Sequence, residues 1–246
     1  MLLALSGVLA GAINAVAGGG SLVSFPALIG LGYSPLVANV TNAVAVLPGY
    51  VTGSATYRQE LAGQGSRALA LAASCAAGAL AGAALLLVSP PALFERLSPF
   101  LVLSAVAMLA AQPLLSRRAG PRHQGRPETG TRRLHLLAFA AALYGGYFSV
   151  GLGLVLLAAL ALSLDDELGR LNALKGLLSL LIGVVSAAYL AVLGPVVWTA
   201  AAAIAVGNAA GGPVGVVLAR RTGDRTLRAA VVALGVGVSV WLLLDA

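Results

Sequence analysis

The first residues whose types suggest chemistry interrupt an apolar stretch: Gly18, Gly19, Gly20 and Ser21. Glycine lets a chain leave helical geometry and lets other groups approach its backbone closely. A helix that restarts at Ser21 points unpaired amides, and the positive end of its dipole, at the groups before it. Such helix starts bind anions, so these four residues are predicted to contact an anionic ligand. The alternative is that the glycines serve helix packing, as small residues do in membranes.

A shorter copy of this break lies 133 residues later, where Gly151 and Gly153 flank a leucine. A helix that restarts at Leu154 would present a second positive end. Two such ends that face each other would make a cationic spot without charged side chains. The pair of breaks therefore predicts one anion site between them.

Lys175 is the basic side chain that lies well inside a predicted apolar segment. It follows Glu167 closely enough that a helix places it about 12 Å into the membrane. Charges at that depth are costly and face a cavity or a partner. Because no predicted segment carries Asp or Glu at comparable depth, we expect an anion as its partner. A snorkelling or carboxylate-paired lysine is the alternative.

Amide and hydroxyl groups accompany this lysine. Asn172 precedes Lys175 by three residues and shares its helix face. Asn39 and Asn42 occupy the corresponding positions of the first half, with Thr41 beside them. Such groups can donate to an oxyanion, but they also hold membrane helices together, and both roles stay open. Three further polar residues are candidates for the same site: Asn14, Tyr147 and Asn208.

The segments that position these groups are strongly apolar. Of the 246 residues, 59% are hydrophobic and 9% are charged, and the mean hydropathy is +0.96. A soluble domain carries roughly a quarter charged residues, and several runs here reach the ~20 residues that a membrane-spanning helix needs. The chain is therefore predicted to be an all-α polytopic membrane protein that lies in a lipid bilayer.

The motifs of several enzyme classes are missing from the sequence. It contains no Walker lysine motif, no His-Glu-x-x-His and no Gly-x-Ser-x-Gly. The run Asp165-Asp166-Glu167 is expected to cap a helix rather than to bind a metal. The net charge of +7 comes from loop arginines, which indicates membrane topology rather than nucleic-acid binding. We expect no enzyme activity, no metal and no cofactor.

Eight apolar segments are expected, four in each half of the chain. They are 2–31, 36–57, 68–88 and 100–115, then 134–164, 168–192, 196–219 and 227–244. The predicted domains are a first membrane repeat (1–115), a basic linker (116–133) and a second membrane repeat (134–246). At the 133-residue offset the two glycine breaks coincide, and five of the ten residues 76–85 recur at 209–218, which indicates internal duplication.

The arginines predict how the segments cross. If all eight segments cross and the linker is cytoplasmic, eight arginines lie inside and six outside. If the broken segments 2–31 and 134–164 instead dip in and return, thirteen lie inside and Arg96 alone outside, as the positive-inside rule favours. The halves then form two inverted repeats, each a broken re-entrant helix hairpin plus three transmembrane helices. Discontinuous helices in such repeats recur in secondary transporters.

Several motifs resemble one family. Gly11-Ala-Ile-Asn14-Ala-Val-Ala-Gly18-Gly19-Gly20-Ser21, Phe25-Pro26-Ala27-Leu28 and Ala38-Asn39-Val40-Thr41-Asn42 resemble the first half of the sulfite exporter (TauE/SafE) family of bacterial membrane transporters. Tyr144-Gly145-Gly146-Tyr147, Gly151-Leu152-Gly153 and Asn172-Ala173-Leu174-Lys175 resemble its second half. The resemblance implies transport of small sulfur-containing or organic anions, such as sulfite or sulfonates.

We therefore expect a secondary transporter that exports a small anionic substrate from a bacterium. The protein would lie in the inner membrane, with the linker 116–133 in the cytoplasm and the substrate bound near the midplane between the two breaks. An anion channel built on the same pore and a non-transporting membrane subunit are the alternatives. Assembly as a homodimer stays open.

Overall fold

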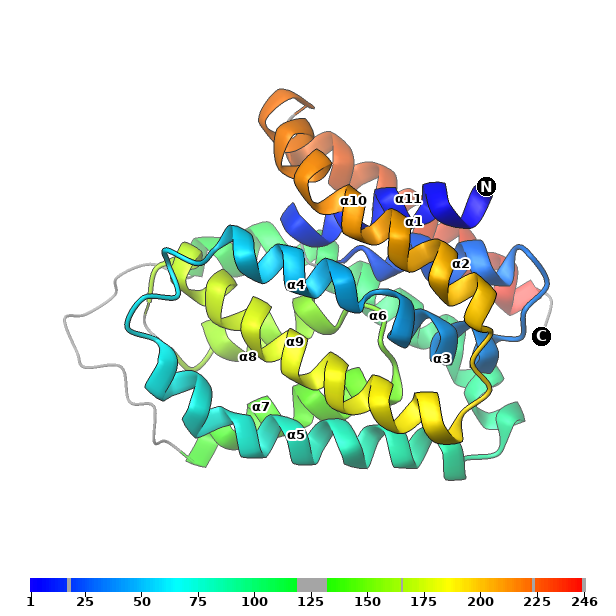
Figure 1. Ribbon diagram of the computed structural model, residues 1–246, viewed down its shortest axis with the longest axis horizontal. Helices are drawn as coiled ribbons and strands as arrows, with labels where there is room; N and C mark the ends of the chain where they lie inside the picture. The colour runs from blue at the N-terminus through cyan, green and yellow to red at the C-terminus, as the bar shows by residue number, and fades with distance from the viewer. Residues whose placement is uncertain (17–18, 119–131, 165, 223, 245–246) are drawn as a thin grey trace.

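The computed structural model describes residues 1–16, 19–118, 132–164, 166–222 and 224–244, and this part of the chain is helical without strands (Figure 1). The predicted all-α class is confirmed. The helices of the described part are α1 (Leu2–Val16), α2 (Ser21–Ile29), α3 (Pro35–Ala45), α4 (Leu47–Thr56), α5 (Gly65–Val88), α6 (Pro91–Arg118), α7 (Arg132–Tyr147), α8 (Leu152–Ala161), α9 (Leu168–Leu193), α10 (Trp198–Thr222) and α11 (Asp224–Leu244). At the 133-residue offset, α1 and α2 correspond to α7 and α8, and the α3–α4 pair corresponds to α9. Helices α5 and α6 correspond to α10 and α11.

Both segments that were predicted to be broken are broken. Between α1 and α2 the chain folds back so tightly that a Cβ on Gly20 would collide with the Ala10 carbonyl oxygen. In the second half α8 begins directly after Gly151, whose φ of +80° is a left-handed conformation that glycine adopts without strain. The glycines at these two places are therefore required by the backbone path.

Two helix boundaries differ from the prediction, and proline explains both. The segment expected at 36–57 is two helices, α3 and α4, because Pro48 lacks the amide that a continuous helix would use there. The segment expected from residue 100 already begins at Pro91, since a proline at the first helical position costs no hydrogen bond. Apolar patterning alone did not locate these boundaries.

Four stretches of the described chain are long and apolar enough to cross a membrane: Pro35–Ala55, Gly65–Val88, Pro91–Gln112 and Leu168–Leu193. They account for four of the six predicted crossings; the other two, α10 and α11, remain predictions. Leu69, Val88 and Val192 are among many large apolar side chains exposed on the helices, a surface that suits lipid. The protein is an integral membrane protein.

Glycines bring the first helix of each half against a long helix of the other half. Gly78 and Gly82 of α5 face α7, and a Cβ on either would crowd a carbonyl oxygen of that helix. Gly207 and Gly211 of α10 face α1 in the same way. Small residues allow this close approach of membrane helices, and here they pair α5 with α7 and α10 with α1.

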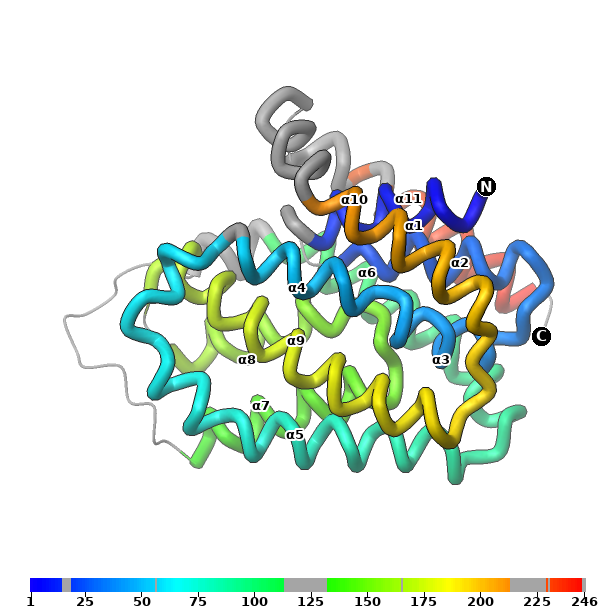
Figure 2. The backbone as a smooth tube through the Cα atoms, viewed as in Figure 1, coloured from blue at the N-terminus to red at the C-terminus, as the bar shows by residue number. Residues whose placement is uncertain are grey.

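Helix α9 lies between the α3–α4 pair and α5 (Figures 1 and 2), and it runs antiparallel to the pair. Gly176 lies beside Ser54, whereas Gly183, further along α9, lies beside the earlier residue Tyr50. At the start of α9, Arg67 forms an ion pair with Asp166. The stretches 58–67 and 166–170 therefore lie at the same end of the molecule.

The α7–α8 pair enters and leaves at that same end. Near the start of α7, His135 Nδ1 and Ser74 Oγ of α5 are 2.9 Å apart. After α8 the chain comes back to the start of α5, where Asp166 contacts Arg67. The segment 134–164 thus dips into the bundle and returns.

Candidate functional site

A small cavity lies where α1, α4, α8 and α9 meet. Its lining consists of polar side chains, two tyrosines and glycines, without an aliphatic side chain among the described residues that form it. The lining residues are Asn14, Gly49, Tyr50, Gly53, Ser54, Tyr57, Gly153, Asn172, Lys175, Gly176 and Ser179. The fold thus brings together four sequence-predicted site residues from three helices, namely Asn14, Gly153, Asn172 and Lys175.

Lys175 supplies the positive charge of this cavity. Its side chain is 7% exposed, and its Nζ donates to Asn172 Oδ1 over 3.1 Å. No ion pair to Lys175 is found within the described residues. A buried ammonium that is held by one neutral amide keeps two N–H donors and most of its charge for another partner.

Three further polar atoms on the cavity wall lack a hydrogen-bond partner in the described part of the chain: Asn14 Nδ2, Ser54 Oγ and Ser179 Oγ. Buried polar atoms are nearly always paired, so these atoms need a ligand or water. Asn14 is held at the first break because its Oδ1 accepts a hydrogen bond from the Gly20 amide at 2.9 Å. With Lys175, the cavity gathers four donor groups around one small space.

The two helix breaks approach each other beside this cavity. Gly19 of the first break lies against the Leu154 side chain at the start of α8, and Gly153 lines the cavity. Ser21 lies beside the hydroxyl of Tyr50, another lining residue. The predicted residue Gly18 lies outside the described residues. Of the described residues of the two breaks, Gly153 lines the cavity, and an anion site between the breaks stays a prediction.

Asn39 and Asn42 use their polar atoms within the protein. Asn39 donates to the Tyr147 carbonyl oxygen (3.0 Å) and accepts from the Ser149 amide (3.1 Å). Asn42 donates to Ser149 Oγ (3.1 Å) and accepts from the Ser24 hydroxyl. These bonds tie α3 to α2 and to the second break. A role of either asparagine in binding an anion stays a prediction.

Thr41 and Tyr147 also lie away from the cavity. Thr41 Oγ1 accepts from the Val197 amide at 3.1 Å, next to the start of α10. The Tyr147 ring packs against Phe94 with ring centroids 5.7 Å apart. Gly151 provides the left-handed turn that starts α8. Their contribution to binding stays a prediction, and the contacts here are structural.

The two halves differ in the environment of the paired polar residues in the middle of each half. Asn172 and Lys175 occupy the places that Asn39 and Asn42 hold in the first half. The serines that satisfy the first pair, at 24 and 149, correspond to a leucine at 157 and a valine at 16. The second pair therefore lacks these serine partners and faces the cavity instead.

The α4 wall of the cavity was not predicted from the sequence. A signal was present, because small and polar residues recur at spacings of three and four along one face of this apolar segment. They are Gly49, Tyr50, Gly53, Ser54 and Tyr57. Ser179, four residues after Lys175, extends the polar face of α9 by the same rule.

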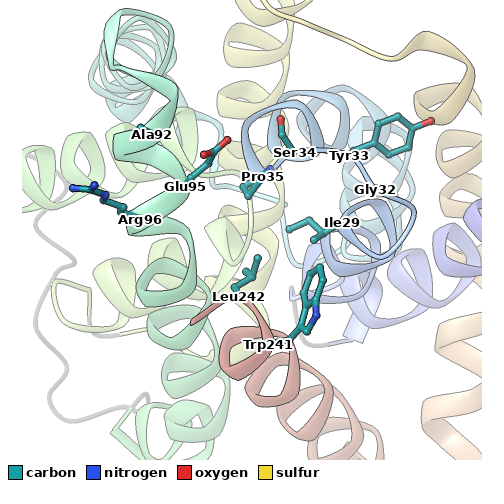
Figure 3. A pocket seen from close by; sticks show the side chains of 10 residues that line it. All are labelled: Ile29, Gly32, Tyr33, Ser34, Pro35, Ala92, Glu95, Arg96, Trp241 and Leu242. Carbon is teal, nitrogen blue, oxygen red and sulfur yellow. The ribbon is translucent and has the colours of Figure 1, made fainter. Parts of the chain in front are cut away.

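A second cavity, of about 540 Å³, lies at the other end of the molecule, between the turn after α2 and the ends of α6 and α11 (Figure 3). Glu95 points into it, Trp241 and Leu242 lie along one side, and Arg96 points away from its centre. None of the predicted site residues lines it. An inward carboxylate disfavours an anion, so the Lys175 cavity is the better candidate.

The Lys175 cavity is narrow. Its volume is about 20 Å³, room for about one water molecule. An oxyanion would therefore require the lining helices or side chains to move apart.

Two arginines form ion pairs with Asp166 at the end of the molecule where α9 begins. Arg67 and Arg170 both contact Asp166, the second over 3.1 Å. Burial acts to raise the pKa of the Asp166 carboxyl, but hydrogen bonds from Arg67, from the Glu167 amide and from Arg170 outweigh it and lower that pKa below its usual value. The ionised carboxylate therefore ties the chain after α8 to α5 and α9.

The curated proteins to which this chain is similar are named as probable membrane transporters. A family model described as sulfite exporter TauE/SafE matches residues 3–242. Over 245 residues the chain is 25% identical to the probable membrane transporter protein YfcA of Escherichia coli (strain K12), a match that covers 97% of this chain and 87% of that protein. It is 23% identical over 245 residues to a probable membrane transporter protein of Haemophilus influenzae, with 97% and 92% covered. No solved structure gives a significant match.

Proposed function

The chain belongs to the sulfite exporter TauE/SafE family, and from that premise we propose that it is a secondary transporter that exports small anions such as sulfite or sulfonates. Family membership makes it a membrane transporter and not an enzyme. The observation that carries the proposal is the buried Lys175, which faces a polar cavity without a carboxylate among its described lining residues. An anion is the partner that this charge lacks.

The other donors would orient the bound anion. The ammonium of Lys175 supplies charge, and Asn14 Nδ2 and the hydroxyls of Ser54 and Ser179 supply directed hydrogen bonds. Hydrogen bonds to a charged acceptor are stronger than those between neutral groups. The start of α8 at Gly153 adds the positive end of a helix dipole. These groups come from four helices, so binding would be sensitive to how the helices sit against one another.

We also propose that the two halves are inverted repeats with two re-entrant hairpins. Three observations support this arrangement. The α3–α4 pair runs antiparallel to α9, its counterpart in the second half. The ion pair of Arg67 with Asp166 joins loops that a model with eight crossings would put on opposite sides of the membrane. The α7–α8 pair returns to the end at which it starts.

In this arrangement the linker 116–133 and the Arg67–Asp166 end face the cytoplasm of a bacterial inner membrane. Arg96 and the larger cavity then face outward. The positive-inside rule supports this orientation, because thirteen of the fourteen arginines fall on the cytoplasmic side.

The narrow cavity favours a carrier over a channel. A channel conducts through a continuous path, whereas a carrier closes around its site between openings to each side. A space of about 20 Å³ fits the second description better. A carrier built this way would open the cavity by moving the hairpins or α4 relative to α9.

Flux into liposomes tests the proposal. Purified protein is reconstituted, and uptake of labelled sulfite is measured with and without unlabelled sulfite inside the vesicles. A carrier gives saturable uptake that internal sulfite accelerates. Unitary currents in planar bilayers would indicate the channel instead, and absence of flux for sulfite, sulfonates and other oxyanions would favour the non-transporting subunit.

A further inference from the structure

The hydroxyls of Ser54 and Ser179 are unusual among the helical serines of the described part of the chain. Helical serines such as Ser98, Ser186 and Ser239 donate to a carbonyl oxygen three or four residues earlier in their own helix. Ser54 and Ser179 are 8% and 1% exposed, yet their hydroxyls have no partner among the described groups. Both line the Lys175 cavity.

The helix crossing brings these two hydroxyls to the cavity that Lys175 lines. Ser54 lies at the point where α4 crosses α9, against Gly176. Lys175 and Ser179 are four residues apart and therefore share one face of α9. A ligand on the ammonium would thus meet one hydroxyl from each helix.

The charge of the cavity limits the charge of its ligand. The titratable groups that face it are Lys175 from α9 and the hydroxyls of Tyr50 from α4 and Tyr57 from its C-cap. The residues that α1 and α8 contribute, Asn14 and Gly153, do not titrate. One buried positive charge balances one negative charge, and a dianion would leave an uncompensated charge out of water.

Hydroxyls also differ from the other donors here, because they accept hydrogen bonds as well as donate them. A lysine ammonium can only donate, and Asn172 Oδ1 is already used by Lys175. A ligand that carries an acid hydroxyl needs an acceptor, and the serine oxygens supply one without the charge of a carboxylate.

From these observations we propose that Ser54 and Ser179 are specificity-determining residues that make the site select the singly charged, protonated form of a small inorganic oxyanion. The inference rests on the proposed function and deepens it. The transported species would be hydrogensulfite rather than the sulfite dianion, so the substrate itself carries a proton across the membrane. The lack of an aliphatic wall in the described lining disfavours a sulfonate with a hydrocarbon tail.

Titration calorimetry of the purified full-length protein tests the proposal with three probes. Sulfite gains a proton near neutral pH, sulfate stays a dianion, and nitrate is a monoanion without a hydroxyl. Above its second ionisation, sulfite affinity is expected to fall about tenfold per pH unit more steeply than nitrate affinity, which reports any loss of the Lys175 charge alone. Sulfate is expected to bind at least about 100-fold more weakly than hydrogensulfite, because it leaves a buried charge uncompensated.

Variants then separate the hydroxyls from the lysine. The double variant Ser54→Ala/Ser179→Ala is expected to weaken sulfite binding about tenfold or more and nitrate binding less than about threefold. Ser186→Ala, a helical serine bonded to its own helix, is the matched control. Ser54→Thr/Ser179→Thr keeps both hydroxyls and should retain the preference for sulfite if the alanine variant folds poorly.

Equal loss of sulfite and nitrate in the alanine variant, or sulfate binding as tight as sulfite, would overturn the proposal. If Lys175→Ala abolishes sulfite binding while the serine variants leave the ratio unchanged, the hydroxyl proposal fails and the proposed function stands. If the wild-type protein binds sulfite at no pH, both fail.

Discussion

A lysine inside a membrane helix needs compensation, and Lys175 receives only the amide oxygen of Asn172 in the described part of the protein. In the first half, the polar side chains at the corresponding positions are hydrogen-bonded within the protein. There Asn39 and Asn42 both hydrogen-bond to Ser149. Three differences distinguish the charged cavity of the second half from the structural junction of the first: a lysine in place of an asparagine, and the replacement of two serines by leucine and valine.

At this scale the first prediction concerns Lys175→Ala. Removal of the buried charge is expected to weaken sulfite binding by about 100-fold, or about 2.7 kcal/mol, since it removes the charged partner of the anion. Calorimetry on purified protein measures this. Lys175→Arg keeps the charge, and Arg96→Ala removes a cation at the other end of the molecule. An unchanged dissociation constant in Lys175→Ala would place the anion elsewhere.

A second prediction concerns the pH dependence of stability through Asp166. Because its pKa is lowered in the folded protein, its contribution to stability is present at neutral pH and is lost as the pH falls through the folded pKa. Asp166→Asn is expected to cost about 1 kcal/mol at pH 7 and progressively less in acid. The thermal midpoint in detergent, measured across pH, reports this difference.

Glu95→Gln is the matched control for that measurement. Glu95 is an exposed acid at the opposite end of the molecule, outside the ion pairs of the described residues. Its replacement should leave the midpoint nearly unchanged at every pH. If Asp166→Asn shows the same small effect, the Arg67–Asp166 contact does not hold the end of α8.

At the scale of elements, the breaks are held by side chains from other helices. Asn39 reaches from α3 to the start of the turn that joins α7 to α8, where it bonds the Tyr147 carbonyl oxygen and the Ser149 amide. Irregular backbone at membrane depth survives only where such groups satisfy it. The hairpin α7–α8 is therefore held in place by the first half of the chain.

The prediction at this scale is that Asn39→Ala destabilises the fold more than Asn172→Ala does. Loss of Asn39 leaves a buried carbonyl oxygen and a buried amide unpaired, at a cost of about 1–3 kcal/mol. Asn172→Ala removes one acceptor of Lys175, the one partner of Asn172 in the described hydrogen bonds, and the loss is smaller because the ammonium already directs its other donors into the cavity. Thermal midpoints compare the two. Similar losses in both variants would mean that Asn172 also has a structural role.

At the scale of the whole molecule, the arrangement of the halves determines which loops share a side of the membrane. The antiparallel packing of α3–α4 on α9 and the Arg67–Asp166 contact put the cytoplasmic loops of the proposed topology together. A topology in which the segment 134–164 crosses would separate them.

Cysteine accessibility tests this topology. Cys75, which is buried, is replaced by alanine, and single cysteines are introduced as Gln124→Cys in the linker, Thr222→Cys and Arg96→Cys. A membrane-impermeant reagent is expected to label the first two only from the cytoplasmic side and the third only from outside. Labelling of the linker and Thr222 positions from opposite sides would contradict the inverted repeats.

The sequence alone determined much of this protein, because membrane helices are specified by local composition. Long apolar runs, a triple glycine and a duplicated pattern were enough to predict an all-α membrane protein, both helix breaks and a buried lysine. Charge counting, a property of whole loops, predicted that the segment 134–164 returns to its own end.

The tertiary structure decided which polar residues face one another. Asn39 and Asn172 look equivalent in the sequence, yet Asn39 is bonded from α3 to the second break whereas Asn172 lines the cavity. Ser54 and the α4 wall became site residues only because α4 crosses α9 at Gly176. Local sequence carries the periodicity of a helix, but the direction in which a helix face points depends on contacts between residues that are distant in the chain.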